Sequence, residues 1–151
     1  MAMVDITSKP EIFREATATG IIKLRPQTLE LIRRNKVAKG DPIYAAKLAG
    51  IQASKKTSTL IPMCHQLQLT NASINVRALK DYALEVTTTV RTKAQTGVEM
   101  EALVATTVGL LTIWDMVKQY EKDAEGQYPK TAIEKIYVIR KVKENGKKKK
   151  R

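Results

Sequence analysis

The sequence has few of the residues that build disulfide frameworks, metal centres and aromatic stacking surfaces. Its 151 residues include one cysteine, one histidine, one tryptophan and one phenylalanine. One cysteine excludes an intrachain disulfide framework, and one cysteine with one histidine cannot supply a closed four-ligand zinc site. No apolar run approaches the roughly 20 residues of a membrane helix, and the start of the chain lacks the apolar core of a signal peptide. We therefore expect a cytoplasmic protein with no membrane partner and no bound metal.

Basic residues outnumber acidic ones, but most of the excess lies at the C-terminus. The chain carries 27 lysines and arginines against 15 acidic residues, a net charge of +12. Residues 140–151 contribute +7 of this charge, and the other 139 residues contribute +5. We interpret residues 143–151 as a basic, frayed and solvated tail, with a weak polyanion-binding arm as the alternative. Residues 1–142 have the length and apolar content of a single domain with a buried core.

The order of the predicted elements indicates an α+β fold. β-branched residues over 12–24 predict a strand, and the proline that follows predicts a short helix over 27–35. Alternating apolar residues over 74–90 predict a β-hairpin, and an apolar helix over 98–120 precedes a final strand over 133–142. With one further helix after residue 41, the order is β-α-α-β-β-α-β. This order predicts a ferredoxin-like antiparallel sheet with helices packed on one face.

The further helix has the clearest start signal in the sequence. Asp41 is typical of an N-cap, and Pro42 is typical of the first helical position. Tyr44, Leu48 and Ile51 then recur at helical spacing. This spacing predicts a stripe that faces the core.

Ionisable residues interrupt the 98–120 helix, whose apolar residues otherwise run nearly all the way round it. Charges on a helix that is buried on more than one side are costly unless they are paired or functional. Asp115 and Lys118 share a face, which predicts either a structural ion pair or an acid/base pair. Glu99 and Glu101 lie in the first turn, where carboxylates interact favourably with the helix dipole whatever else they do.

Glu101 and Asp115 point to nearly the same side of this helix but are far apart. Fourteen residues correspond to about 21 Å along a helix axis. Two groups so far apart on a straight helix cannot both contact one small ligand. If both serve one site, that site must combine two copies of the chain.

Two residues before the 74–90 hairpin, Cys64 and His65, and one group of lysines are further candidates with weaker signals. Cys64-His65 are a poor metal site and a doubtful nucleophilic pair, because sequence neighbours on a strand point to opposite faces. His65 is either a structural residue or a ligand-binding one. Lys39 precedes a helix N-terminus and, with Lys55 and Lys56, predicts either a phosphate-binding patch or ordinary solvated lysines. The sequence contains no GxxxxGK[ST] phosphate loop.

Several segments together closely resemble the cyclic pyranopterin monophosphate synthase family. They are KGDPIYAAKLAGIQASKKTSTLIPMCHQL (39–67), TGVEMEAL (96–103) and LTIWDMVK (111–118), with MVDITSKP and FREATATG near the start. The resemblance implies a phosphorus-oxygen lyase of molybdenum cofactor biosynthesis. Such an enzyme rearranges (8S)-3′,8-cyclo-7,8-dihydroguanosine 5′-triphosphate into cyclic pyranopterin monophosphate and releases diphosphate. The resemblance also implies a homohexamer, a trimer of dimers, with active sites at subunit interfaces and no cofactor.

The resemblance assigns roles residue by residue. Asp115, Lys118 and Lys39 match catalytic positions. Family members often end with KSGGKSG, whereas this chain reads KVKENGK over 141–147, so either Lys141 or Lys143 replaces the expected lysine. The remaining matches are to substrate-binding positions: Met63, Cys64, His65, Met100, Glu101, Glu99, Lys55 and Arg14.

Two other functions fit the predicted fold, a small RNA-binding domain and a non-catalytic oligomeric scaffold. RNA-binding modules of this fold stack bases on exposed sheet aromatics, which are scarce here, and no GFGFV-like segment occurs. We therefore expect no specific nucleic-acid partner. A scaffold would not need Asp115 and Lys118 in its central helix.

Overall fold

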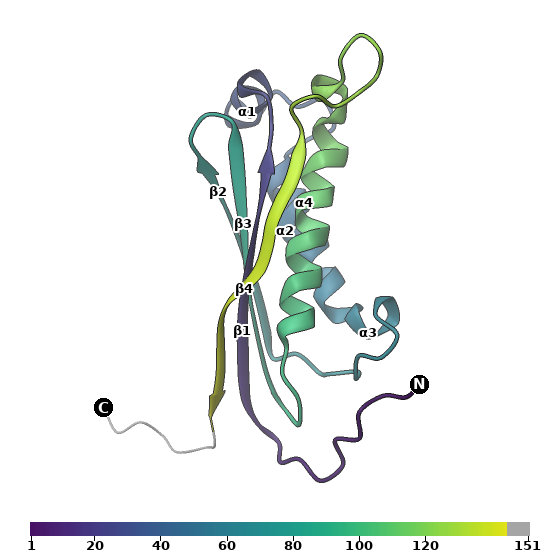
Figure 1. Cartoon of the computed structure of the whole chain (residues 1–151). Helices are drawn as coiled ribbons and strands as arrows, with labels where there is room; N and C mark the ends of the chain where they lie inside the picture. The colour runs from purple at the N-terminus through teal and green to yellow at the C-terminus, as the bar shows by residue number, and fades with distance from the viewer. Residues whose placement is uncertain (145–151) are drawn as a thin grey trace, which may run out of the picture.

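A four-stranded antiparallel sheet forms one layer of the structure (Figure 1). The computed structural model describes residues 1–144. Its strands run in the order β2-β3-β1-β4, and each neighbouring pair is antiparallel. This order and the βαββαβ connectivity confirm the predicted ferredoxin-like fold class. The strands are β1 (Ile12–Lys23), β2 (Asn71–Leu79), β3 (Ala83–Ala94) and β4 (Ala132–Glu144).

The helices lie on one face of the sheet (Figure 1). The long helices α2 (Pro42–Lys55) and α4 (Glu99–Glu121) lie side by side, with α4 in contact with three strands. Figure 1 shows α1 (Pro26–Arg33) at one end of the molecule and α3 (Thr57–Leu60) at the other. The short α3 was not predicted from the sequence.

The last strand is longer than predicted. β4 includes Lys143 and Glu144, which we had assigned to the tail. The rest of the predicted tail, residues 145–151, lies outside the described residues.

The core fills the space between the sheet and α4. Leu110 and Ile113 of α4 are fully buried against Ile22, Leu84 and Val86 of the sheet. By length and composition α4 could cross a membrane, but half of its most apolar window is buried inside this fold. The helix is therefore accounted for as the core helix of a sheet-and-helix sandwich.

The predicted core-facing stripe of α2 is wrong. Tyr44 is 67% exposed and Leu48 is 49% exposed. The buried face of α2 instead carries small residues, including Ala46, Gly50 and Ala53. Small residues let α2 approach α4 closely, so the contact selects that face and leaves the large apolar side chains outside.

The predicted cap at the start of α2 is confirmed. The Asp41 carboxylate accepts hydrogen bonds from the backbone N–H groups of Ile43 and Tyr44, at 2.9 and 3.1 Å. Gly40, just before the cap, has a φ of 112°, a conformation that glycine adopts without strain. The capped turn fixes the position of Lys39 beside α4.

Candidate functional site

Most of the predicted substrate-binding residues meet at the N-terminal end of α4. They line a cavity of about 300 Å³, which we call the N-terminal cavity. Its walls come from the chain start, the segment after α3, the β3–α4 connection and the first turn of α4. The predicted residues in these walls are Met63, Cys64, His65, Glu99, Met100 and Glu101.

An ion pair joins this cavity to the last strand. The Lys141 ammonium contacts the Glu99 carboxylate. Burial raises the pKa of Glu99. The hydrogen bond from Lys141 and the charges of Lys141 and Arg14 lower the pKa by more than burial raises it, so the net shift is downward. Of the two lysines that the sequence left open, Lys141 is the one that reaches the cavity.

Arg14 lies behind the cavity rather than in its lining. Its side chain is buried, and it donates hydrogen bonds to the backbone carbonyls of Ala94 and Gln95, at 3.3 and 3.1 Å. These bonds hold the connection from β3 to α4. In this chain Arg14 therefore positions the segment that precedes Glu99.

Glu101 is a buried carboxylic acid, with 4% of its surface exposed. Burial raises its pKa, and the nearby Glu99 charge adds to the increase. A carboxyl group with a raised pKa can carry a proton closer to neutral pH than an ordinary glutamate does. Glu101 is thus suited to proton transfer.

Cys64 and His65 lie in an irregular segment between α3 and β2, and both line the cavity. Strand alternation therefore does not separate them, contrary to the sequence argument. Burial raises the pKa of the Cys64 thiol, so the thiolate is disfavoured. The His65 Nε2–H donates to the Val4 carbonyl at 2.7 Å, which ties the chain start to the cavity. Within residues 1–144, no group of three or more His, Cys, Asp or Glu side chains could hold a metal ion.

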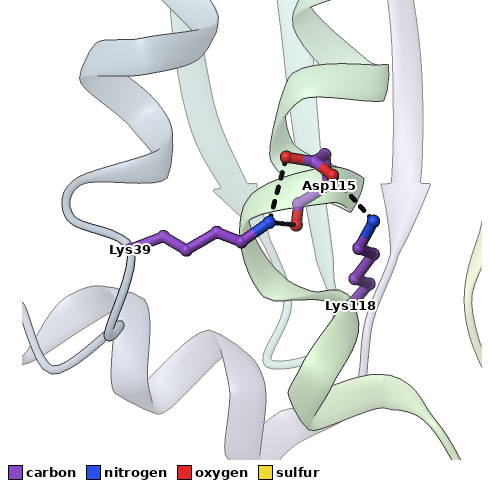
Figure 2. A network of polar contacts seen from close by, with 3 residues as sticks. All are labelled: Lys39, Asp115 and Lys118. Atoms are coloured by element: carbon purple, nitrogen blue, oxygen red, sulfur yellow. Dashed lines mark hydrogen bonds and ion pairs between the residues drawn. The ribbon is translucent and has the colours of Figure 1, made fainter.

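The predicted catalytic residues form a separate network near the other end of α4 (Figure 2). The Asp115 carboxylate lies between two ammonium groups, 2.9 Å from Lys118 and 3.1 Å from Lys39. Lys39 also donates to the Asp115 backbone carbonyl at 2.9 Å. The hydrogen bonds from Lys118 and then Lys39 lower the pKa of Asp115, and the bond to Asp115 raises the pKa of Lys118. These shifts favour the charged forms of both Asp115 and Lys118.

This network lies on an open strip of α4. The helix is buried on two sides, by the sheet and by α2, as predicted, but Leu111 and Asp115 are exposed and Lys118 is half-exposed. Neither side chain is buried, so the free-energy cost of burying a charge is no argument for a paired or functional role of Asp115 and Lys118. That cost applies only to Glu101 and to the buried Glu121.

Two aromatic residues beside the network were missed as site residues. Trp114 and Tyr128 pack edge to face, with ring centroids 5.3 Å apart, and border a hollow of about 400 Å³ with Asp115 and Lys118. Tyr128 comes from the loop between α4 and β4, so its sequence position gives no sign of this contact. Trp114 precedes Asp115 on α4, and its position next to a candidate acid was the available signal.

The two clusters share no lining residue within one chain. Glu101 lines the N-terminal cavity, and Asp115 borders the hollow near the other end of the same unbroken helix. This separation agrees with the distance argued from the sequence. Lys55, in the last turn of α2, is exposed and borders neither cluster.

Comparison with known proteins gives one consistent answer. Residues 3–144 match the MoaC family. The chain is 53% identical over 144 residues to a probable cyclic pyranopterin monophosphate synthase of Sulfolobus acidocaldarius, covering 95% of this chain and all of the relative. Proteins of the same name from Thermococcus onnurineus and Pyrococcus furiosus are 54% and 52% identical, covering 95% and 94% of this chain and 92% and 90% of their own lengths. These matches confirm the family resemblance seen in the sequence. The chain belongs to the MoaC family.

Proposed function

We propose that this enzyme is a lyase of molybdenum cofactor biosynthesis that forms cyclic pyranopterin monophosphate. Its substrate is (8S)-3′,8-cyclo-7,8-dihydroguanosine 5′-triphosphate, and diphosphate is the second product. The observation that carries the proposal is the Lys39–Asp115–Lys118 network, held in a chain more than half identical to proteins named for this activity. Because the substrate derives from guanosine triphosphate, we place the reaction in the cytoplasm.

The charges of the network suit a triphosphate substrate. Two ammonium groups share one carboxylate, so the network carries a net positive charge. Lysine ammonium groups stabilise the charge that develops on a departing diphosphate. Lys39, fixed at the start of α2, is the residue that we assign to the phosphate chain.

Proton transfer can begin from Lys118. Because Asp115 raises the pKa of Lys118, the free enzyme holds this lysine in its protonated form. Lys118 therefore begins the reaction as a proton donor, and Asp115 sets its proton affinity and its position. Glu101, with its pKa raised by burial, is the matching group at the other end of the helix.

We also propose that each active site is completed by a second chain within a homohexamer built as a trimer of dimers. A single chain leaves Glu101 and Asp115 about 21 Å apart by the rise of an α-helix. Large apolar side chains lie exposed on the helical face, where they would be covered in an assembly: Tyr44 of α2, Leu60 of α3 and Leu111 of α4. The shared site would place substrate between the N-terminal cavity of one chain and the lysine network of another.

Incubation with (8S)-3′,8-cyclo-7,8-dihydroguanosine 5′-triphosphate tests the reaction directly. We expect stoichiometric release of diphosphate and a pterin that becomes fluorescent after oxidation. Asp115→Asn should lower turnover about 100-fold or more, the range typical of a positioned acid/base group. Glu30→Gln is the matched control, because Glu30 also pairs with two cations on a helix surface, Arg33 and Arg34. Absence of both products with folded protein would refute the proposed function.

A further inference from the structure

A cavity of about 620 Å³ lies at the end of the molecule that carries α1, and we call it the α1 pocket. It is larger than the N-terminal cavity and the hollow beside Asp115. Its walls are the end of β1, the start of α1, the β2–β3 turn and the loop before β4, which meet at one end of the sheet (Figure 1). It shares no lining residue with the N-terminal cavity or with the lysine network.

The α1 pocket is lined by positive charge. Lys23, Arg25 and Lys130 border it, and no acidic residue is part of its lining. Lys23 also lies 3.4 Å from Glu134, so part of its charge is already balanced. The concentration of cations around a volume typical of small-molecule sites indicates an anionic ligand.

One nitrogen of the half-buried Arg25 side chain lacks a partner. Its Nε is buried without a hydrogen bond, the one such side-chain nitrogen or oxygen among the described residues. A buried N–H group without an acceptor costs free energy. Because the Nε itself is closed to solvent, an anion in the pocket would bind Arg25 through the terminal nitrogens of the guanidinium. A guanidinium also matches two oxygens of a phosphate group in its plane.

A buried carboxylate fixes the two backbone segments that carry Arg25 and Lys130. Glu121 is fully buried, and its oxygens accept hydrogen bonds from the Arg25 backbone N–H at 3.0 and 3.2 Å. It also accepts from the hydroxyl of Thr131, next to Lys130, at 2.8 Å, and from the hydroxyl of Thr28. The backbone around both cations is therefore held in place before any ligand arrives, which favours binding.

We propose that the α1 pocket binds a phosphorylated small molecule, with Arg25 as its anchor and Lys23 and Lys130 as flanking cations. The Tyr82 ring and the two prolines of the lining provide an apolar wall for the rest of such a ligand. The site is distinct from the one assigned to the reaction, and the proposal does not depend on the proposed function.

Lysine acetylation followed by mass spectrometry tests the pocket residue by residue, with inorganic diphosphate as the probe and the full chain in its native assembly. At about ten times its Kd, diphosphate should slow acetylation of Lys23 and Lys130 about tenfold. Exposed Lys122, just after α4, is the internal control and should react at an unchanged rate. Sodium chloride at matched ionic strength should protect neither pocket lysine.

Variants identify the anchor. Arg25→Gln should abolish the protection, whereas Lys122→Gln, which removes a charge from the same loop, should leave it intact. Lys130→Gln changes an exposed side chain and should weaken the protection of Lys23, which keeps the proposal testable if Arg25→Gln does not fold. Stronger protection by guanosine diphosphate would assign a nucleotide, and equal protection would assign the diphosphate group alone.

Three results would overturn the proposal. They are unchanged acetylation of Lys23 and Lys130, equal protection by chloride, and protection that survives Arg25→Gln in folded protein. Protection confined to Lys39 and Lys118 would support the proposed reaction site and reject the α1 pocket, so the two proposals can fail separately.

Discussion

The Asp115 carboxylate forms ion pairs with two lysines from different parts of the chain. It accepts from Lys118 within α4 and from Lys39 in the turn before α2, and Figure 2 shows it between the two lysines. The interaction lowers the pKa of the acid and raises the pKa of Lys118. The proton affinity of Lys118 therefore depends on this one carboxylate.

Removing the Asp115 charge should change the titration of Lys118. In Asp115→Asn the lysine loses the carboxylate that favours its charged form, so its pKa should fall, and Lys118 should lose its proton at lower pH than in the wild type. Titration of the lysine side-chain carbon and nitrogen chemical shifts by NMR measures this directly. In Glu30→Gln the Lys118 titration should stay where it is. An unchanged Lys118 pKa in Asp115→Asn would show that the carboxylate does not set it.

Tyr128 should contribute binding rather than proton transfer. Its ring borders the hollow beside Asp115 and Lys118, where it can contact the ring system of the substrate. Tyr128→Leu should raise KM about tenfold, in line with the worth of one aromatic stacking contact, while Tyr128→Phe should remain near wild type. Tyr137→Leu, at an exposed tyrosine of β4 outside the hollow, is the control. A fall in kcat with unchanged KM would contradict this role.

At the scale of elements, local signals predicted where helices and strands begin more accurately than which face they bury. The Asp41 cap and the hairpin predicted over 74–90, in whose turn Lys80 has a φ of 58°, depend on a few neighbouring residues and were found. The buried face of α2 was not, because it depends on how closely α4 approaches. Likewise, strand alternation puts Lys141 and Lys143 on the same face, so the sequence could not choose between them. The ion pair with Glu99 in the folded chain identifies Lys141.

The close contact of α2 with α4 should depend on Gly50. A Cβ at this position would lie 2.9 Å from the Ala105 backbone carbonyl and would also meet the Ile74 side chain. Gly50→Ala should therefore lower the free energy of unfolding by about 1–3 kcal/mol, the usual cost of overpacking. Urea denaturation monitored by circular dichroism measures the change.

Gly109→Ala in α4 is the matched control, because its nearest neighbours would be 3.4 Å and 3.6 Å away. It should leave stability unchanged or raise it by up to about 1 kcal/mol, since alanine favours helix. Equal stability of the two variants would mean that the helices can separate without loss.

At the scale of the whole molecule, the sequence was sufficient to predict the sheet, the long helix and the positions of Glu101 and Asp115 on it. Within one chain the two clusters stay apart, because α4 separates Glu101 from Asp115 by the rise of the intervening helical turns. What could not be predicted locally, such as Tyr128 and the buried Glu121, comes from loops and ends that only the tertiary fold brings together. In the proposed shared site, function depends on a contact that a single chain cannot make.

The last prediction is that two inactive variants restore each other. Glu101→Gln and Asp115→Asn damage different halves of a shared site, so a mixed dimer contains one site with both changes and one with neither. Random mixing makes half of all dimers mixed, and activity should recover to about a quarter of wild type after co-expression. Asp115→Asn mixed with Lys118→Ala is the control. Both changes lie in the same half, so every site keeps one defect and no activity should return. Verified mixed assemblies of the first pair that stay inactive would place the whole site within one chain or show that neighbouring sites are coupled.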